Sequence, residues 1–286
     1  MAAISGRPDD PKLHLTQSGH ATPRTAARPG TVLNEFVPDV RPVIAIDFDD
    51  VLCKTNHAVA AWHNDAHGTK MALDDFYYYY YWMNPYWGNP DETVRKVEEI
   101  WKSDYLDRAD PVEGAAEGLA ALAARGFRLV LVTARQPREL ERSLGWLDKH
   151  MPGLIDTMIC TGQSQETLAD EKELVTKLSK AEVCRRLGAK LMVDDSAENA
   201  LKCAVADPPV PVVLFGEYEW NKRVGRYSDV SKETSFEDRL AREGGREFWK
   251  EESLEKELPP GAPLYRVKDW EALIDWVDKQ REEGRI

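Results

Sequence analysis

The sequence predicts an α/β fold: a doubly wound, mostly parallel, Rossmann-like sheet with a helical segment inserted near its start. Two observations predict this fold. Short apolar runs that are typical of buried strands alternate with helical patterns along the chain. Acidic or hydroxyl side chains stand at the carboxyl ends of three of these runs, which is where such sheets bind their ligands.

Five runs are predicted strands. The first, VIAIDF after Arg41-Pro42, is apolar up to its acids, as expected for a strand that is buried on both faces of a parallel sheet. The others are FRLVLVT at 127–133, AKLMVDD at 189–195, VPVVLFG at 210–216 and an edge strand, LYRV, near the C-terminus.

Helical patterns connect these strands. The pattern from Ala115 to Arg125 stops at Gly126, and the one from Lys180 to Leu187 stops at a glycine too, which is a typical end of a helix. A final helix, DWEALIDWVDKQ, follows the last strand. Strands alternating with helices predict right-handed βαβ crossovers.

The predicted organisation has three parts. Residues 1–40 are rich in Pro, Gly, Thr, Ser and Arg without apolar periodicity, and we expect a disordered arm there. Residues 41–53 and 113–286 form the α/β core, with a charged loop and helix insertion at 222–262. Residues 54–112 are far longer than a simple crossover and contain an amphipathic pattern, which predicts a mainly helical cap over the functional edge of the sheet.

Composition limits the partners. A formal net charge of −12 argues against a nucleic-acid polymer or an acidic membrane surface, whereas a small anionic ligand is compatible with a metal ion in a pocket. No apolar run approaches the ~20 residues that span a bilayer. Four scattered cysteines without a CxxC pair favour reduced thiols in the cytoplasm, with the nucleus or an organelle reached by a transit peptide as alternatives. The sequence gives no prediction of oligomeric state.

Carboxylates mark the ends of two predicted strands. Asp47 and Asp49 end the first strand, and such crowding is unfavourable unless a cation or protons offset the repulsion. Magnesium takes oxygen ligands from one or two carboxylates, waters and substrate phosphate. Asp194 and Asp195 end another strand and are candidates for the missing ligand. The alternative, that these acids only cap helices, is disfavoured because Thr133 ends a third strand in the same way.

The pattern resembles that of the haloacid dehalogenase superfamily. The first motif of that superfamily, DxDx(T/V)L, is similar to DFDDVL at 47–52, although Asp50 stands where many members have Gly. The second, a Thr or Ser that ends a strand, is similar to Thr133 in LVTAR. The long gap between them is where members with a C1-type cap carry it. Among these, the chain is most similar to the 5′(3′)-deoxyribonucleotidase-type group.

The third and fourth motifs lie further along the chain. A Lys at the start of a helix matches Lys180, with Lys172 and Lys177 as nearby alternatives. The acidic loop of the fourth motif matches VDDS, where Asp195 aligns with the metal-binding acid and Asp194 is the second candidate.

The resemblance implies a Mg²⁺-dependent, two-step phosphomonoester hydrolysis. Asp47 would attack phosphorus and form an aspartyl phosphate, and Asp49 would protonate the leaving alcohol and then deprotonate water. The Asp47 carboxylate, the Asp49 backbone carbonyl and Asp195 would hold the ion. Thr133 and Lys180 would bind the phosphate. Dehalogenases lack a carboxylate at the position of Asp49, so dehalogenation is disfavoured.

The expected substrate is a small phosphorylated metabolite, and nucleoside monophosphates are the first to test. Residues 77–82, YYYYYW, could form an aromatic wall on which a base or sugar stacks. Packing within the cap is the favoured alternative, because five consecutive tyrosines cannot all face one way. His63 and His67 are expected to pack or to lie at the surface rather than to bind metal. Two rival functions are a phosphoprotein phosphatase of the DxDx(T/V) type and a non-catalytic binding protein with this fold.

Overall fold

A computed structural model describes residues 39–162, 178–225 and 235–286. The chain divides into two compact units, residues 1–40 and 41–286, and every element below belongs to the second. The predicted N-terminal arm therefore lies almost entirely outside the described residues, as do Lys172 and Lys177. Within the described ranges, no helix is long and apolar enough to cross a membrane.

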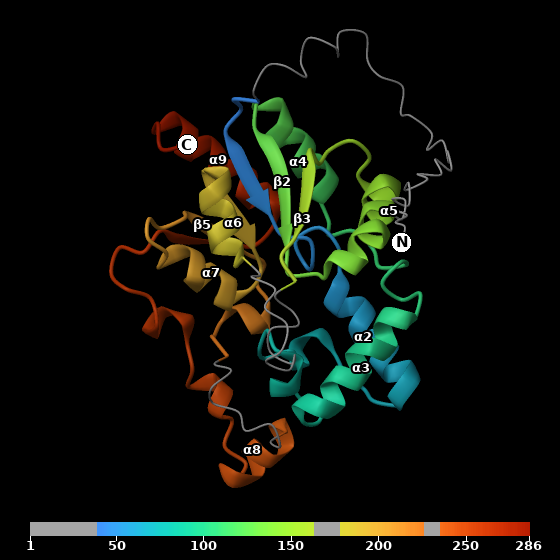
Figure 1. Ribbon diagram of the computed structural model, residues 1–286. Coiled ribbons are helices and arrows are strands. Elements are labelled where there is room, and N and C mark those ends of the chain that lie inside the picture. Colours follow the sequence, from blue (N-terminus) through green and yellow to red (C-terminus); the bar gives the residue numbers. More distant parts are fainter. Residues whose placement is uncertain (1–38, 163–177, 226–234) are drawn as a thin grey trace, which may run out of the picture. The chain divides into compact units, whose positions relative to one another are not determined.

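A six-stranded parallel sheet organises residues 41–286, in the order β3-β2-β1-β4-β5-β6 (Figure 1). The strands are β1 (Val43–Ile46), β2 (Arg128–Thr133), β3 (Thr157–Cys160), β4 (Leu191–Asp194), β5 (Val212–Phe215) and β6 (Leu264–Val267). The direction of winding reverses between β1 and β4, so their carboxyl ends form a topological switch point. The predicted fold class is confirmed, with β3 as an additional strand at one edge.

Helices cover both faces of the sheet. On one face, α4 (Ala115–Ala124), α5 (Leu140–His150) and α9 (Trp270–Glu282) pack over one set of strand side chains. On the other face, α6 (Lys180–Leu187) and α7 (Ala197–Ala204) pack over the alternate set. Because successive strand residues point to opposite faces, β1 supplies Ile44 and Ile46 to the first core and Ala45 to the second.

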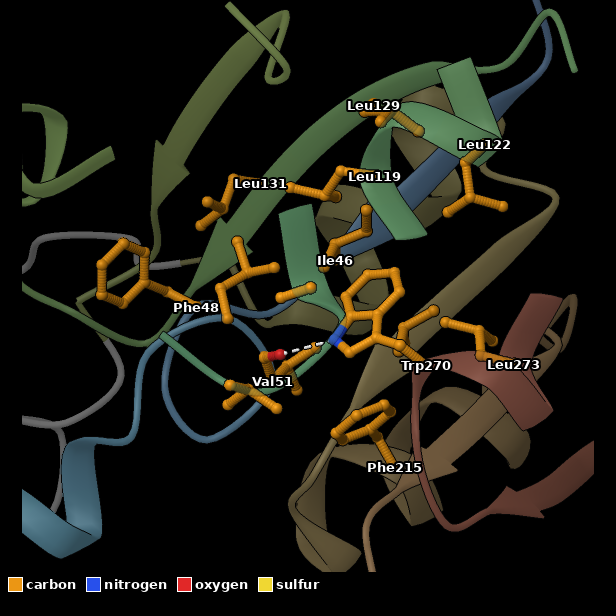
Figure 2. Close-up of a cluster of buried hydrophobic side chains, with 14 of the residues drawn as sticks. Ile46, Phe48, Val51, Leu119, Leu122, Leu129, Leu131, Phe215, Trp270 and Leu273 are labelled. Atoms are coloured by element: carbon orange, nitrogen blue, oxygen red, sulfur yellow. Dashed lines mark hydrogen bonds between the residues drawn. The ribbon is translucent and has the colours of Figure 1, made fainter. Parts of the chain in front are cut away.

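The C-terminal helix supports the loop that follows β1. The indole Nε1 of Trp270 donates a hydrogen bond of 3.0 Å to the carbonyl oxygen of Val51, as Figure 2 shows. The Trp270 ring fits in its place because residue 118 is glycine. A Cβ added to Gly118 would lie 2.1 Å from the ring. Residues near the end of the chain thus hold the segment that carries the first acidic motif.

Residues 54–112, hereafter the inserted segment, contain α2 (Thr55–His67) and α3 (Pro90–Lys102), with single 3₁₀ turns at Leu73–Asp75 and Tyr81–Met83. Helix α3 begins with a capping box: Asn89 accepts from the Glu92 N–H, and Glu92 accepts from the Asn89 N–H. The segment has an apolar cluster of its own, to which one residue from beyond β5, Trp220, also belongs.

The predicted insertion at 222–262, hereafter the charged insertion, contains α8 (Phe236–Arg242) and 3₁₀ turns at Phe248–Lys250 and Leu254–Lys256. It packs on the first half of the tyrosine run. Tyr77 stacks on Trp249 with ring centroids 4.5 Å apart and planes 15° apart, and Tyr78 donates its hydroxyl proton to Glu252 at 2.6 Å. These two tyrosines are packing residues, but their partners Trp249 and Glu252 belong to the charged insertion, whereas the favoured prediction for the run was packing within the cap.

Candidate active site

The residues singled out at strand ends meet at the switch point. Asp47 directly follows β1, Asp194 ends β4 with Asp195 next to it, and Thr133 ends β2. These strands are neighbours in the sheet and run parallel, so their carboxyl ends share one edge. Lys180 enters the same place from the first turn of α6, where the Ser179 hydroxyl caps the helix by accepting from the Glu182 N–H.

Lys180 lies between two carboxylates. Its Nζ is 2.7 Å from Oδ2 of Asp47 and 2.8 Å from Oδ2 of Asp194, and its side chain is 1% exposed. A buried ammonium is tolerated only where nearby anions compensate its lost hydration, and here two do so. The structure therefore places the candidate lysine in direct contact with the candidate nucleophile.

Asp47 is held firmly. Its N–H donates to the carbonyl of Val193, and its own Oδ1 accepts the N–H of Phe48 at 2.7 Å. Burial, together with the nearby carboxylates of Asp194 and Asp49, raises the pKa of Asp47 to about 7, although Lys180 opposes the shift. A bound cation would act against that shift and favour the ionised form that a nucleophile requires.

The carboxylates form a site that suits a hard cation. Among the described residues, Asp47, Asp194 and Asp195 offer carboxylate oxygens that all lie within 4.8 Å of one another. Burial and the neighbouring Asp47 carboxylate raise the pKa of Asp195 well above its usual range. Buried acids without a counter-charge are unfavourable, and an oxygen-binding divalent ion such as Mg²⁺ would offset their repulsion.

Asp194 and Asp195 differ in their contacts. Asp194 accepts from Lys180 through Oδ2 and from the Ser196 N–H, at 2.9 Å, through Oδ1, so both of its oxygens are engaged. Asp195 accepts the indole N–H of Trp220 through Oδ2 at 2.6 Å. This difference favours Asp195 over Asp194 as the partner of Asp47 in holding a metal ion.

Asp49 points to a different set of partners. Arg135 Nη2 donates to Oδ1 of Asp49 at 2.7 Å, and the Thr55 hydroxyl donates to the same oxygen at 2.5 Å. Burial acts to raise the pKa of Asp49, but the Arg135 guanidinium, the Thr55 hydroxyl and the Lys180 charge together outweigh it and hold the pKa below its usual range. Among the described acids, Asp49 is not one of those whose carboxylate oxygens lie close enough together to hold a metal ion. Only its backbone carbonyl is left as a candidate metal ligand.

Thr133 is fully buried and fixed. Its hydroxyl oxygen accepts the Arg135 N–H at 3.2 Å, which leaves the hydroxyl proton available to a ligand. Its carbonyl oxygen accepts both the N–H and the hydroxyl of Thr161, at 2.8 and 3.0 Å. The turn after β2 is therefore held from both sides.

Asp50 adopts a left-handed conformation, with φ of 54°. Glycine adopts this conformation most easily, but Asp tolerates it better than most residues because its short polar side chain can bond locally. Here both carboxylate oxygens accept the N–H of Asn56, at 3.1 and 3.2 Å, at the start of α2. This explains how Asp replaces the Gly that many members of the superfamily carry there.

Two later members of the tyrosine run, Tyr79 and Tyr81, lie close enough to the acids for those charges to affect their pKa values. Burial raises the pKa of Tyr79 well above its usual range. The nearby charge of Lys180 opposes this shift, and those of Asp47 and Asp194 add to it. Tyr81 donates to Oδ1 of Asn56 at 2.8 Å and stacks on Trp87 with centroids 4.3 Å apart. The run is therefore divided between packing and the neighbourhood of the site.

Of the three histidines of α2, His63 packs within the inserted segment and His67 lies exposed at its surface. His63 is fully buried, its Nδ1 is 2.8 Å from the Thr69 hydroxyl, and its ring lies 5.1 Å from that of Trp87. Burial lowers its pKa to about 4. The burial of His63 and the exposure of His67 correspond to the two predicted positions, packing and surface.

Two residues with close contacts to the site, Arg135 and Trp220, had no assigned role from the sequence. Arg135 lies two residues after Thr133, the last residue of β2, and this position was a usable signal. Trp220 follows β5, but nothing in its neighbours indicates a bond to Asp195.

A parallel sheet with this strand order and acids at its switch point fits a phosphatase of the haloacid dehalogenase superfamily, and a match to a nucleotidase family supports an enzyme that hydrolyses phosphomonoesters. The family described as "5′ nucleotidase, deoxy (Pyrimidine), cytosolic type C protein" matches residues 41–223, and the chain belongs to this family. A search of curated proteins returned no match.

Several solved structures are similar to the chain. A predicted phosphatase from Clostridium acetobutylicum is 12% identical, with a TM-score of 0.49, over 84% of this chain and 99% of that one. A putative phosphatase from Clostridium difficile is 15% identical, with a TM-score of 0.49, over 83% and 98%. A HAD family hydrolase from Deinococcus radiodurans R1, with bound phosphate and sodium, is 14% identical, with a TM-score of 0.47, over 86% and 97%.

Proposed function

We propose that the chain is a Mg²⁺-dependent hydrolase of small phosphomonoesters that works through an aspartyl phosphate on Asp47. The observation that carries the proposal is the position of Lys180, whose Nζ contacts Asp47 at 2.7 Å at the edge where Asp195 also lies. A nucleophilic carboxylate, a cation that lowers the repulsion between it and a phosphate, and further acids for a metal are the parts that phosphoryl transfer needs.

In the first step, a carboxylate oxygen of Asp47 attacks phosphorus while the bond from phosphorus to the alcohol oxygen breaks. The neutral form of Asp49, which the Arg135 guanidinium makes the minor form, gives its proton to that oxygen, so the alcohol leaves neutral. In the second step, water gives a proton to Asp49 and its oxygen attacks phosphorus, which releases inorganic phosphate and restores Asp47. Lys180 and the Thr133 hydroxyl bind the phosphoryl oxygens.

Asp47, Asp195 and the backbone carbonyl of Asp49 would hold the metal ion. When bound, Mg²⁺ neutralises charge on the phosphoryl oxygens. Asp194 serves a different purpose: it keeps Lys180 in place, because its Oδ2 is 2.8 Å from Nζ.

We further propose that residues 54–112 form the cap over this site and select a small substrate, with nucleoside monophosphates the first candidates. Tyr79 lies near the acids and would offer an aromatic face to a base or sugar. Helix α3 and the aromatic residues of the segment cluster with Trp220, which also bonds Asp195, so the segment lies against the site. Such a cover disfavours the phosphoprotein phosphatase alternative, and membership of an enzyme family disfavours the non-catalytic one.

The test is a screen of phosphate release from nucleoside and sugar monophosphates, with and without Mg²⁺. We expect wild-type protein and Asp148→Asn, an exposed acid on α5, to release phosphate only with the metal. Asp47→Asn is expected to lose the activity by at least about a thousandfold, because the nucleophile is gone. Turnover by Asp47→Asn at the wild-type rate would refute the mechanism.

A further inference from the structure

Arg135 holds the carboxylate that is proposed to donate the proton. Nη2 donates to Oδ1 of Asp49 at 2.7 Å, and Nε lies 3.2 Å from both Oδ1 and Oδ2. The guanidinium thus grips the carboxylate with two nitrogens in a fixed fork, which lysine cannot do.

The guanidinium itself has almost no freedom. It is 5% exposed, and Nη1 donates to the Ser143 hydroxyl at 2.8 Å. Its Cζ lies 4.0 Å from the centroid of the Phe48 ring on one side and 5.2 Å from that of Trp101. A planar cation that packs on aromatic rings and donates along its edge is fixed in orientation.

The inserted segment contributes to this environment. Trp101 belongs to α3, and its carbonyl oxygen accepts a hydrogen bond of 2.7 Å from Arg142 Nη1 on α5. The core and the inserted segment therefore meet at the place where Arg135 is held. The orientation of Asp49 depends in part on a ring that the inserted segment supplies.

The two oxygens of Asp49 are engaged unequally. Oδ1 accepts from both Thr55 and Arg135 at short distances, whereas Oδ2 has the weaker 3.2 Å contact with Arg135 Nε. Oδ2 is thus the oxygen better able to exchange a proton with a substrate, while Oδ1 serves as the anchor.

We propose that Arg135 is a positioning residue that fixes Asp49 so that Oδ2 faces the leaving oxygen, with Trp101 of the inserted segment completing the hold. The inference rests on the proposed function, because it assumes that Asp49 gives a proton to the alcohol as the bond to phosphorus breaks. An alcohol of high pKa needs that proton, whereas p-nitrophenolate leaves without one.

The test compares two esters of similar size, p-nitrophenyl phosphate and p-nitrobenzyl phosphate, through kcat/KM, which reports the steps up to release of the leaving group. For Arg135→Gln we expect a loss of about a hundredfold on the benzyl ester and a loss at least about tenfold smaller on the nitrophenyl ester. Trp101→Leu is expected to show the same selectivity to a lesser degree. Arg138 lies on the same loop, and its side chain is 65% exposed. Arg138→Gln is therefore the matched control, and we expect it to leave kcat/KM unchanged for both esters.

Equal losses on both esters, or no loss on either, would overturn the inference, because a merely structural role has no reason to depend on the leaving group. Melting temperatures show which variants are folded. If Arg135→Gln does not fold, Arg135→Lys and Ser143→Ala replace it and are judged by the same ratio. Asp47→Asn separates the two proposals: if it still cleaves both esters, the proposed function fails, whereas its inactivity with equal Arg135 losses overturns only the role of Arg135.

Discussion

Trp220 Nε1 donates a hydrogen bond of 2.6 Å to Oδ2 of Asp195, and both residues are buried. Trp220 lies in the turn after β5, stacks on Tyr218 with centroids 4.2 Å apart and planes 7° apart, and belongs to the apolar cluster of the inserted segment. A candidate metal ligand is therefore oriented by a side chain that the inserted segment holds in place. Bonds of this kind to a ligand carboxylate fix its direction and tune its affinity for metal.

We predict that Trp220→Phe lowers the affinity for Mg²⁺ by about tenfold or more, since the ring is nearly retained but the hydrogen bond to Asp195 is lost. Titration calorimetry on metal-free protein measures this directly. The matched control is Trp276→Phe on α9, where the ring packs on Tyr265 far along the chain from the acids. An unchanged Mg²⁺ affinity in folded Trp220→Phe would contradict the assigned role of this bond.

Lys180 should matter for both stability and activity. Lys180→Met leaves the buried Asp47 and Asp194 without their shared cation, and we expect it to lower the free energy of unfolding by about 3–5 kcal/mol. Adding Asp194→Asn removes one of the unpaired charges and keeps the acceptor for the Ser196 N–H. Urea unfolding should show that this double variant regains part of the lost stability.

Phosphate release separates the two effects. Neither the single nor the double Lys180 variant is expected to hydrolyse substrate, because the cation that meets the phosphate is missing from both. Recovery of activity together with stability in the double variant would mean that Lys180 serves only the fold.

Glu198 predicts a pH dependence of stability. Burial raises its pKa from 4.5 to about 7, while its oxygens accept from the Gly225 N–H and the Ser196 hydroxyl. The folded protein thus keeps this proton between about pH 4.5 and 7, where the unfolded chain has released it. The resulting stability is fully present below pH 4.5 and is lost as pH rises through 7.

Glu198→Gln removes the ionisation and retains an acceptor for Gly225. We predict that it is more stable than wild type at pH 8, by up to about 3 kcal/mol, and little different at pH 4.5. Urea unfolding at the two pH values measures the difference. A difference of the same size at both would show that the effect is not electrostatic.

The tyrosine run should divide into two functions. Tyr77→Leu removes a ring stacked on Trp249 and is expected to cost about 1 kcal/mol of stability without changing the KM for a nucleoside monophosphate. Tyr79 lies near the acids. Tyr79→Leu is expected to raise that KM severalfold with little change in melting temperature. Each variant is the control for the other, and the reverse assignment of effects would contradict the proposed substrate wall.

The central strands were predictable because their signal is local. Strands β1, β2, β4 and β5 are continuous apolar runs, buried throughout or nearly so, and each is followed by a polar residue or a turn. Strand β3 was missed since its four residues, TMIC, are half-buried at the sheet edge and form no apolar run.

The candidate site follows the same division. Asp47, Thr133 and Asp195 were predictable because residue type and position at a strand end are visible in the sequence, and parallel strands bring their carboxyl ends together. The bond between Arg135 and Asp49 joins residues 86 positions apart, and that between Trp220 and Asp195 joins residues 25 apart. Such contacts depend on how loops and the inserted segment pack, which no local pattern encodes.

The central claim, a phosphoryl group carried by Asp47, is tested most directly by trapping it. Protein is mixed with a ³²P-labelled phosphomonoester and Mg²⁺, quenched in acid during turnover, and denatured. We predict label that stays with the wild-type chain, is released by hydroxylamine as an acyl phosphate is, and maps to the peptide that contains Asp47, with none in Asp47→Asn. Rapid turnover by wild type with no protein-bound label at any quench time, or label that Asp47→Asn retains, would contradict the account.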